Sequence, residues 1–194
     1  MPNRWEDAAR LRHLEGADRD RWFPRARILS WLELAEGAAV ADIGAGAGFL
    51  VGELAVAVGR AGRVLAVDPS PAARARLMER FGDGTYPQVV VSEGRGESTG
   101  LDDRSVDRMV WMAVYHEFSD VLAAFREARR VLKPDGRLVV ADWKPEASGI
   151  GPPSHERMPR AHAEATATAA GFRRVGGDDL SEVCWGLVLE PSGE

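Results

Sequence analysis

Residues 40–49 read VADIGAGAGF, a short apolar run that ends in a loop with three glycines. The apolar run predicts a strand over 39–43, and the pattern that follows predicts a helix over 49–58. Glycine reaches positive φ angles and carries no Cβ, so the loop 44–48 lets the backbone pass close to a ligand. Free N–H groups at the start of the helix then face anionic or polar ligand atoms.

An acidic residue follows this loop by about twenty residues, the spacing expected of a group that binds a ribose. Asp68 ends a second apolar run over 63–67, where a carboxylate can accept hydrogen bonds from both hydroxyls of a ribose. A glycine loop paired with such a carboxylate is more specific than either feature alone. In the simpler alternative, the glycines form only a tight turn and Asp68 only caps the helix that follows Pro69.

Two residues of the loop region weigh against a nicotinamide cofactor. The dinucleotide fingerprint G-x-G-x-x-G requires a third glycine at position 49, where this chain has Phe49. Asp42, just before the first glycine, is also unexplained by that fingerprint. A nicotinamide oxidoreductase is therefore a weaker alternative for this sequence.

Strands and helices alternate along the rest of the chain. This order predicts an α/β fold, with a Rossmann-like, seven-stranded, mainly parallel sheet and helices on both faces. The last two strands are joined by a connection too short for a crossover helix, so the last strand is expected to be antiparallel. We predict one domain over 1–194, with a helical N-terminal preface over 1–36. The other predicted features are strands over 89–91, 106–112, 137–141, 172–175 and 183–189, helices over 71–80 and 121–132, a type I turn at Lys133–Gly136, a loop over 142–158 and an alanine-rich helix after Pro159.

Composition limits the classes of partner. The chain has 194 residues, 45% hydrophobic and 28% charged, and a formal net charge of -5, which disfavours nucleic acid as a substrate. Its one cysteine, Cys184, excludes an internal disulfide, and no metal site is expected. Neither a signal peptide nor an apolar stretch of the ~18 residues needed to span a membrane is evident. We expect a cytoplasmic protein without a membrane partner; its oligomeric state does not follow from the sequence.

The sequence resembles the class I S-adenosylmethionine-dependent methyltransferases, in particular the small-molecule branch with the quinone-methylating and arsenite-methylating enzymes. The resemblance covers nearly the whole chain. It rests on Asp42–Gly48 as the first motif, on Asp68 as the acidic ribose position, on residues 103–107 before the fourth strand, and on residues 132–136 before the fifth.

The resemblance implies S-adenosylmethionine as the cofactor. Asp68 would hold the ribose and Pro69 one side of the adenine, while Trp111 and Met112 would face the methionine portion mainly through backbone groups. The residues of the first motif that would hold the methionine portion are Asp42, Gly44, Ala45, Gly46 and Gly48.

The adenine contact departs from the family pattern. Arg95 stands where relatives often carry an aspartate that contacts the adenine amino group. Either the backbone at Gly96 makes this contact alone, or the carboxylate of Glu97 or Glu93 replaces the aspartate.

The candidate base is His116. Methyl transfer from a sulfonium is an in-line displacement that depends on positioning, and a phenol or an activated carbon also benefits from proton removal. Tyr115, His116 and Glu117 follow the fourth strand, where similar methyltransferases often have a histidine. A hydrogen-bonded packing role is the alternative for His116.

Other residues are candidates for shaping the acceptor pocket. Trp22 and Phe23 would cap the cofactor or pack in the core, Asp142 and Trp143 would end the fifth strand beside the acceptor, and His155 would enter from the following loop or face solvent. The expected function is methyl transfer to a small phenolic or quinol-type acceptor. A protein that binds S-adenosylmethionine without catalysis remains the alternative.

Overall fold

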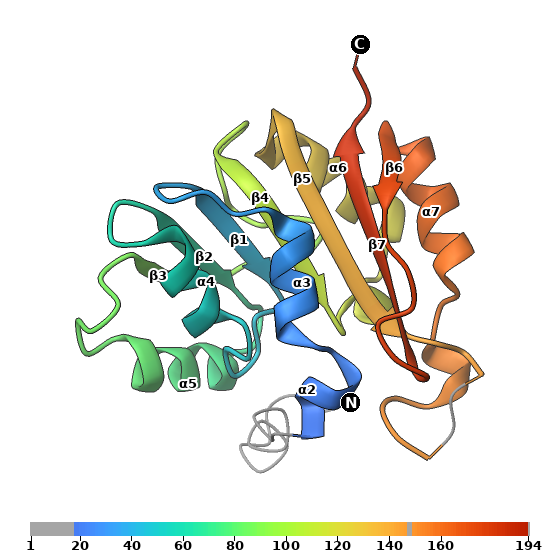
Figure 1. Cartoon of the computed structure of the whole chain (residues 1–194), viewed down its shortest axis with the longest axis horizontal. Helices are drawn as coiled ribbons and strands as arrows, with labels where there is room; N and C mark the ends of the chain where they lie inside the picture. The colour runs from blue at the N-terminus through green and yellow to red at the C-terminus, as the bar shows by residue number, and fades with distance from the viewer. Residues whose placement is uncertain (1–17, 147–148, 194) are drawn as a thin grey trace.

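A seven-stranded sheet with helices on both faces forms the body of the molecule (Figure 1). The computed structural model describes residues 18–146 and 149–193. The strand order is β3-β2-β1-β4-β5-β7-β6. The strands are β1 (Ala39–Ile43), β2 (Arg63–Val67), β3 (Val89–Ser92), β4 (Val106–Met112), β5 (Leu132–Trp143), β6 (Phe172–Gly176) and β7 (Cys184–Pro191). The helices are α2 (Asp18–Trp22), α3 (Arg25–Leu32), α4 (Val51–Val58), α5 (Pro71–Phe81), α6 (Val121–Val131) and α7 (Arg160–Ala169), with short 3-10 turns η1 (Tyr115–Glu117) and η2 (Ser154–Glu156).

The strand directions agree with the prediction. β1 pairs in parallel with β2 and β4, and the β2–β3 and β4–β5 pairs are also parallel. β7 runs antiparallel to both β5 and β6, so the predicted antiparallel last strand is confirmed. Because the parallel strands end at one edge of the sheet, the loops after β1, β2, β4 and β5 meet there.

The start of β5 differs from the prediction. The sequence predicts a turn at Lys133–Gly136 and a strand from Arg137, whereas β5 begins at Leu132 and includes these residues. Val106 pairs with Leu132 and Arg108 pairs with Arg137, so the predicted turn is an irregularity within the strand. Proline has no N–H to donate to a neighbouring strand, which explains why regular pairing is interrupted here.

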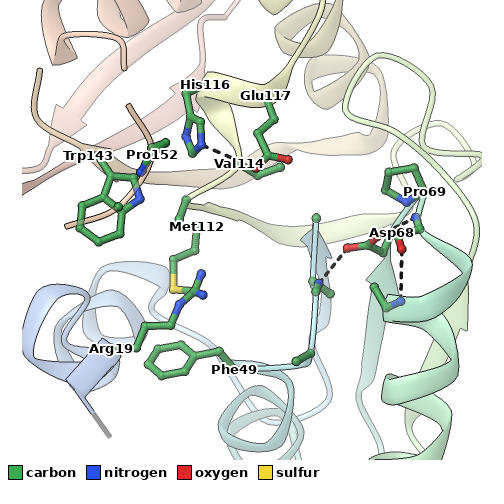
Figure 2. A pocket seen from close by; sticks show the side chains of 18 of the residues that line it. Arg19, Phe49, Asp68, Pro69, Met112, Val114, His116, Glu117, Trp143 and Pro152 are labelled. Atoms are coloured by element: carbon green, nitrogen blue, oxygen red, sulfur yellow. Dashed lines mark hydrogen bonds and ion pairs between the residues drawn. The ribbon is translucent and has the colours of Figure 1, made fainter. Parts of the chain in front are cut away.

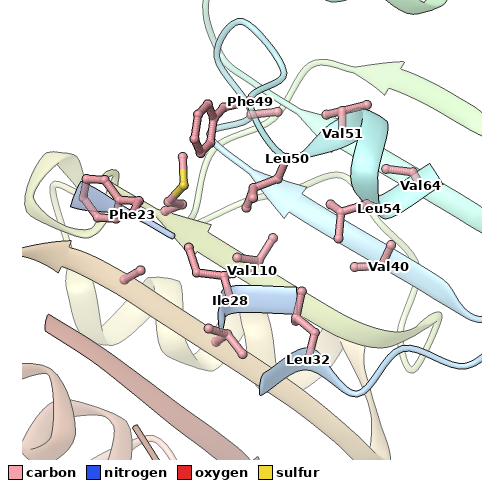
Figure 3. Close-up of a cluster of buried hydrophobic side chains, with 14 of the residues drawn as sticks. Phe23, Ile28, Leu32, Val40, Phe49, Leu50, Val51, Leu54, Val64 and Val110 are labelled. Atoms are coloured by element: carbon pink, nitrogen blue, oxygen red, sulfur yellow. The ribbon is translucent and has the colours of Figure 1, made fainter. Parts of the chain in front are cut away.

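Alternation along the strands divides the core between the two faces of the sheet. Val40 belongs to a cluster with α3 and α4, whereas its neighbour Ala41 belongs to a cluster with α6 and α7. Figure 3 shows the first cluster, in which Ile28 and Leu32 of α3 lie over Val110 of β4. The predicted covering of both faces by helices is therefore confirmed.

Two short helices precede the sheet within the predicted preface of residues 1–36. α2 and α3 meet at Phe23 and Pro24, and the Phe23 side chain is fully buried. Residues 1–17 lie outside the described residues. In the described part of the chain, no helix is long and apolar enough to cross a membrane.

Candidate functional site

A cavity of about 600 Å³ lies at the carboxyl ends of the parallel strands, where such sheets bind ligands. The glycine loop after β1 lines it, together with Met112 at the end of β4. Asp68 and Pro69 lie on one side of the cavity, and Trp143 and Pro152 lie on the other (Figure 2). The loops after four neighbouring strands thus contribute to a single cavity.

The glycine loop has the close approach that the sequence predicts. Gly44 has a φ of 72°, and a Cβ on it would lie 2.5 Å from Cγ2 of Val114. A Cβ on Gly48, whose φ is 81°, would lie 2.6 Å from Cε2 of Phe81. Gly44, Ala45 and Gly46 line the cavity, whereas the position of Gly48 serves packing against α5. The loop continues to residue 50, so α4 begins two residues later than predicted.

Asp68 connects the glycine loop to the helix after β2. Its Oδ2 accepts the backbone N–H of Gly46 at 2.8 Å, and its Oδ1 accepts that of Ser70 at 2.8 Å. Burial raises the pKa of Asp68, while the two backbone hydrogen bonds and the charge of Arg74 oppose the increase. Each oxygen keeps a lone pair, so the carboxylate can still accept hydroxyl groups from the cavity.

Asp42 lies behind the loop, and its side chain is buried. Burial raises the pKa of Asp42 to about 7, and the charge of Asp68 adds to the increase, while Arg19 opposes it. Asp42 does not belong to the cavity lining. Asp42 is therefore a buried neighbour of the site and does not form part of the cavity wall.

The two residues predicted at the end of β4 face opposite ways. Met112 lines the cavity. The side chain of Trp111 packs on the other face of the sheet, with its ring centroid 5.0 Å from that of Phe118 and 4.8 Å from that of Phe125. Successive side chains of a strand alternate between faces, so the side chain of Trp111 points away from the cavity and Trp111 is not part of the lining.

In the segment after β3, a basic residue lines the cavity and the predicted acidic residue does not. Arg95 and not Glu97 belongs to the lining. Oε1 of Glu97 accepts the backbone N–H groups of Ser119 at 2.7 Å and Asp120 at 3.1 Å, so its carboxylate caps the start of α6. Gly96 lies against the ring of Phe118 and is also outside the lining.

His116 is held by Asp142. Nδ1 of His116 lies 2.8 Å from Oδ1 of Asp142, and the backbone N–H of His116 donates to Oδ2 at 3.0 Å. Burial lowers the pKa of His116, but the hydrogen bond and charge of Asp142 raise it, and the net shift is upward. A carboxylate only accepts, so Nδ1 carries the proton and the lone pair of the neutral ring is on Nε2, which lies 3.6 Å from Oε1 of Glu117. His116 also lines the cavity, so this geometry suits a general base.

The far wall of the cavity consists of Trp143 and the loop after β5. Gly151, Pro152 and Pro153 belong to the lining, and a Cβ on Gly151 would lie 2.8 Å from the Trp143 ring. The buried Arg157 donates to the carbonyl of Pro152 at 2.8 Å and also to that of Ile150, so it holds the loop in place.

The remaining aromatic and histidine candidates lie outside the lining. Trp22 and Phe23 have ring centroids 5.6 Å and 5.0 Å from that of Trp143, so they support this wall from behind. The His155 side chain is 80% exposed. Arg19 of α2 does line the cavity, although no motif in the sequence indicates it.

Comparison with known proteins identifies the family. Residues 41–140 match the model of the methyltransferase domain family. A 2-phytyl-1,4-naphtoquinone methyltransferase of Thermosynechococcus vestitus is 31% identical over 123 residues, which are 63% of this chain and 54% of that protein. An uncharacterized methyltransferase of Mycobacterium tuberculosis is 38% identical over 123 residues, which are 63% of this chain and 46% of that protein. The chain thus spans about half the length of these curated relatives.

A solved structure matches nearly the whole chain. The S-adenosylmethionine-dependent methyltransferase from Aquifex aeolicus is 28% identical, with a TM-score of 0.88 over 94% of this chain and 97% of that one. The family match covers the glycine loop, Asp68 and the end of β4, which line the cavity, and it ends at residue 140, before Trp143 and the loop of the far wall. The chain therefore belongs to the methyltransferase domain family, with the fold of the class I S-adenosylmethionine-dependent methyltransferases.

Proposed function

We propose that the chain transfers a methyl group from S-adenosylmethionine to a small acceptor of phenolic or quinol type. The observation that carries this proposal is the position of His116, held by Asp142, in the same cavity as the glycine loop and Asp68. A base and a cofactor site that share one cavity can act on one acceptor molecule.

The cavity residues fit the cofactor by their chemistry. The Asp68 carboxylate suits the ribose hydroxyls, the backbone of Gly44–Gly46 suits the methionine portion, and Pro69 with Arg95 suits the adenine side. S-adenosylmethionine carries a net positive charge, which agrees with the carboxylates of Asp68 and Glu117 in the cavity lining. Two phosphates of a nicotinamide dinucleotide would meet the same carboxylates unfavourably. When bound, the cofactor supplies an electrophilic methyl group.

The acceptor side of the cavity is apolar and suits a flat ring. Trp143, Pro152 and Val114 lie around His116 (Figure 2). Aromatic rings and prolines bind flat apolar molecules by contact area, and one polar group then fixes the orientation. Two relatives are named for quinone-type chemistry, the naphtoquinone methyltransferase described above and a demethylmenaquinone methyltransferase of Bacillus subtilis, 26% identical over 127 residues. Their names support this acceptor class.

In the proposed mechanism, His116 removes a proton from the acceptor. Asp142 holds Nδ1–H, so that the lone pair of Nε2, beside Glu117, accepts the hydroxyl proton. The resulting imidazolium is stabilised by the adjacent Asp142 carboxylate, and the acceptor oxygen or carbon becomes a stronger nucleophile. The loop held by Arg157 limits the access of water to this side of the cavity.

The experiment is a transfer assay with S-adenosylmethionine labelled in its methyl group. Simple phenols, catechols and naphthoquinols are offered as acceptors, with single-stranded RNA and DNA as comparison acceptors. We expect label in a phenolic or quinol product and none in nucleic acid. Cofactor binding without transfer to any ring acceptor would contradict the acceptor class and favour a protein that binds the cofactor without catalysis.

A further inference from the structure

Arg19 presents a buried guanidinium to the cavity from the short helix α2. Its guanidinium carbon lies 5.4 Å from the ring centroid of Phe49 and 5.9 Å from that of Phe23. Figure 2 shows the side chain beside Met112 at the edge of the glycine loop. The Nε atom is buried and has no hydrogen-bond partner among the described residues. A buried N–H in this state indicates a missing acceptor.

Carboxylates near Arg19 attract it electrostatically but form no ion pair with it among the described residues. Burial lowers the pKa of Arg19 to about 10, and the charges of Asp42, Glu117 and Asp142 are among those that oppose the decrease. In the part of the chain that the structure describes, none of these carboxylates forms an ion pair with Arg19 within 4 Å. An arginine remains charged at neutral pH, so its donors face the cavity as a positive group.

The cofactor has one group that matches this position. S-adenosylmethionine carries a sulfonium and an ammonium as its cations, and its α-carboxylate is its only anion. Two arginines line the described cavity, Arg19 and Arg95. Arg95 follows β3, which lies beyond β2 and Asp68 in the sheet, so Arg95 is on the adenine side of the cavity. Arg19 instead lies against Phe49, at the end of the glycine loop. Because the loop is assigned to the methionine portion, Arg19 is at the end where the α-carboxylate belongs.

We propose that Arg19 binds the α-carboxylate of the cofactor and that this contact fixes α2 against the cavity. The proposal rests on the proposed function, because it requires the cofactor in this site. A guanidinium matches a carboxylate with two parallel hydrogen bonds, one of which satisfies Nε. α2 has only five residues, so one strong contact with the ligand is a large share of what holds it in place. Arg19 is thus a positioning residue that makes the fit of the N-terminal helices depend on the cofactor.

The test compares two ligands that differ at the methionine end. S-adenosylhomocysteine has the α-carboxylate, whereas 5′-methylthioadenosine has the same adenosine and thioether without it. In the full chain, Arg19→Met should weaken S-adenosylhomocysteine binding roughly tenfold or more, as expected for the loss of a charged hydrogen bond, and leave 5′-methylthioadenosine binding nearly unchanged. Unchanged binding of the second ligand also demonstrates that the variant is folded. Arg19→Lys, which keeps the charge without the planar pair of donors, should retain part of the preference.

The matched control is Arg21→Met, which removes an exposed arginine from the same helix and should change neither affinity. Hydrogen exchange provides a second readout: amides of residues 19–23 should be protected by S-adenosylhomocysteine in the wild type and not by 5′-methylthioadenosine. Equal weakening of both ligands in Arg19→Met and Arg19→Lys, or an unchanged preference in Arg19→Met, would overturn the proposal while leaving the proposed function intact. Failure of the wild type to bind either ligand would overturn the proposed function as well.

Discussion

Asp142, near the end of β5, accepts hydrogen bonds from His116 in η1, one from the imidazole Nδ1 at 2.8 Å and one from the backbone N–H at 3.0 Å. The Asp142 carboxylate thereby holds both the imidazole ring and the backbone of His116. This orientation places the lone pair of the neutral ring on Nε2, on the side of Glu117. This relationship allows the role of each partner to be tested separately.

Asp142→Asn should lower the rate of methyl transfer and shift its pH dependence. Asp142 raises the pKa of His116, and the neutral ring is the active base, so the wild-type rate falls as pH falls through that raised pKa. Without the carboxylate the pKa of His116 decreases, so the acidic limb moves to lower pH. The rate at high pH should fall about tenfold or more, because the ring orientation is lost. A pH profile with an unshifted acidic limb would argue against the pairing of these residues during catalysis.

His116→Ala should leave cofactor affinity nearly unchanged and lower single-turnover methyl transfer by ~10²-fold or more, the usual scale of general-base assistance. Single-turnover conditions are needed because slow product release can mask a change in the chemical step. His155→Ala, at an exposed histidine, is the control and should behave as the wild type. If His116→Ala reacts at the wild-type rate, His116 has a structural role and proximity alone accounts for catalysis.

Asp68→Ala should weaken cofactor binding by ~1–3 kcal/mol, as expected for the loss of a charged hydrogen-bond partner. Calorimetric titration with S-adenosylhomocysteine measures the change. The contacts with Gly46 and Ser70 mean that folding also loses stability. Asp120→Ala is a matched control, because its carboxylate likewise accepts a backbone N–H, that of Ala123 at 2.9 Å, and Asp120 is outside the cavity lining. Equal cofactor affinity in Asp68→Ala and the wild type would leave Asp68 with a capping role only.

Gly44→Ala should destabilise the fold by about 1–3 kcal/mol, because the new Cβ is strained at positive φ and overlaps Val114. Gly84→Ala separates the two causes, since Gly84 has a φ of 88° and nothing within 4 Å of an added Cβ. Urea unfolding should therefore show a larger loss for Gly44→Ala, and Val114→Ala in the same chain should relieve part of it. Equal losses at the two glycines would mean that the close approach to Val114 carries no cost.

The sheet and the cofactor loop could be predicted from local patterns. The alternation of strands and helices indicates a parallel sheet, and the short connection between β6 and β7 indicates their antiparallel pairing. Asp68 is identified by its distance from the glycine loop, and its hydrogen bond to Gly46 places it in the same cavity. The sheet and the Asp68 position depend on residues close together in the sequence or on the order of strands and helices along the chain.

The rest of the site depends on contacts between distant segments. Glu97 follows the motif position for the adenine contact, but the start of α6 lies beside it and takes its carboxylate, which no local pattern indicates. Arg157 holds the loop over the cavity through backbone carbonyls, and such contacts have no sequence signal. Arg19 stands on a helix of five residues, too short for a recognisable periodic pattern. The different directions of Trp111 and Met112, in contrast, follow from strand alternation.

The central claim is that the cavity between the glycine loop and Asp68 binds S-adenosylmethionine. The most direct measurement is calorimetric titration of the wild-type chain with S-adenosylhomocysteine and, separately, with NAD. We predict saturable binding of S-adenosylhomocysteine and far weaker binding of NAD, because Phe49 replaces the third glycine of the dinucleotide fingerprint and the Asp68 carboxylate is hydrogen-bonded to the loop. Saturable binding of NAD with no binding of S-adenosylhomocysteine would contradict the account.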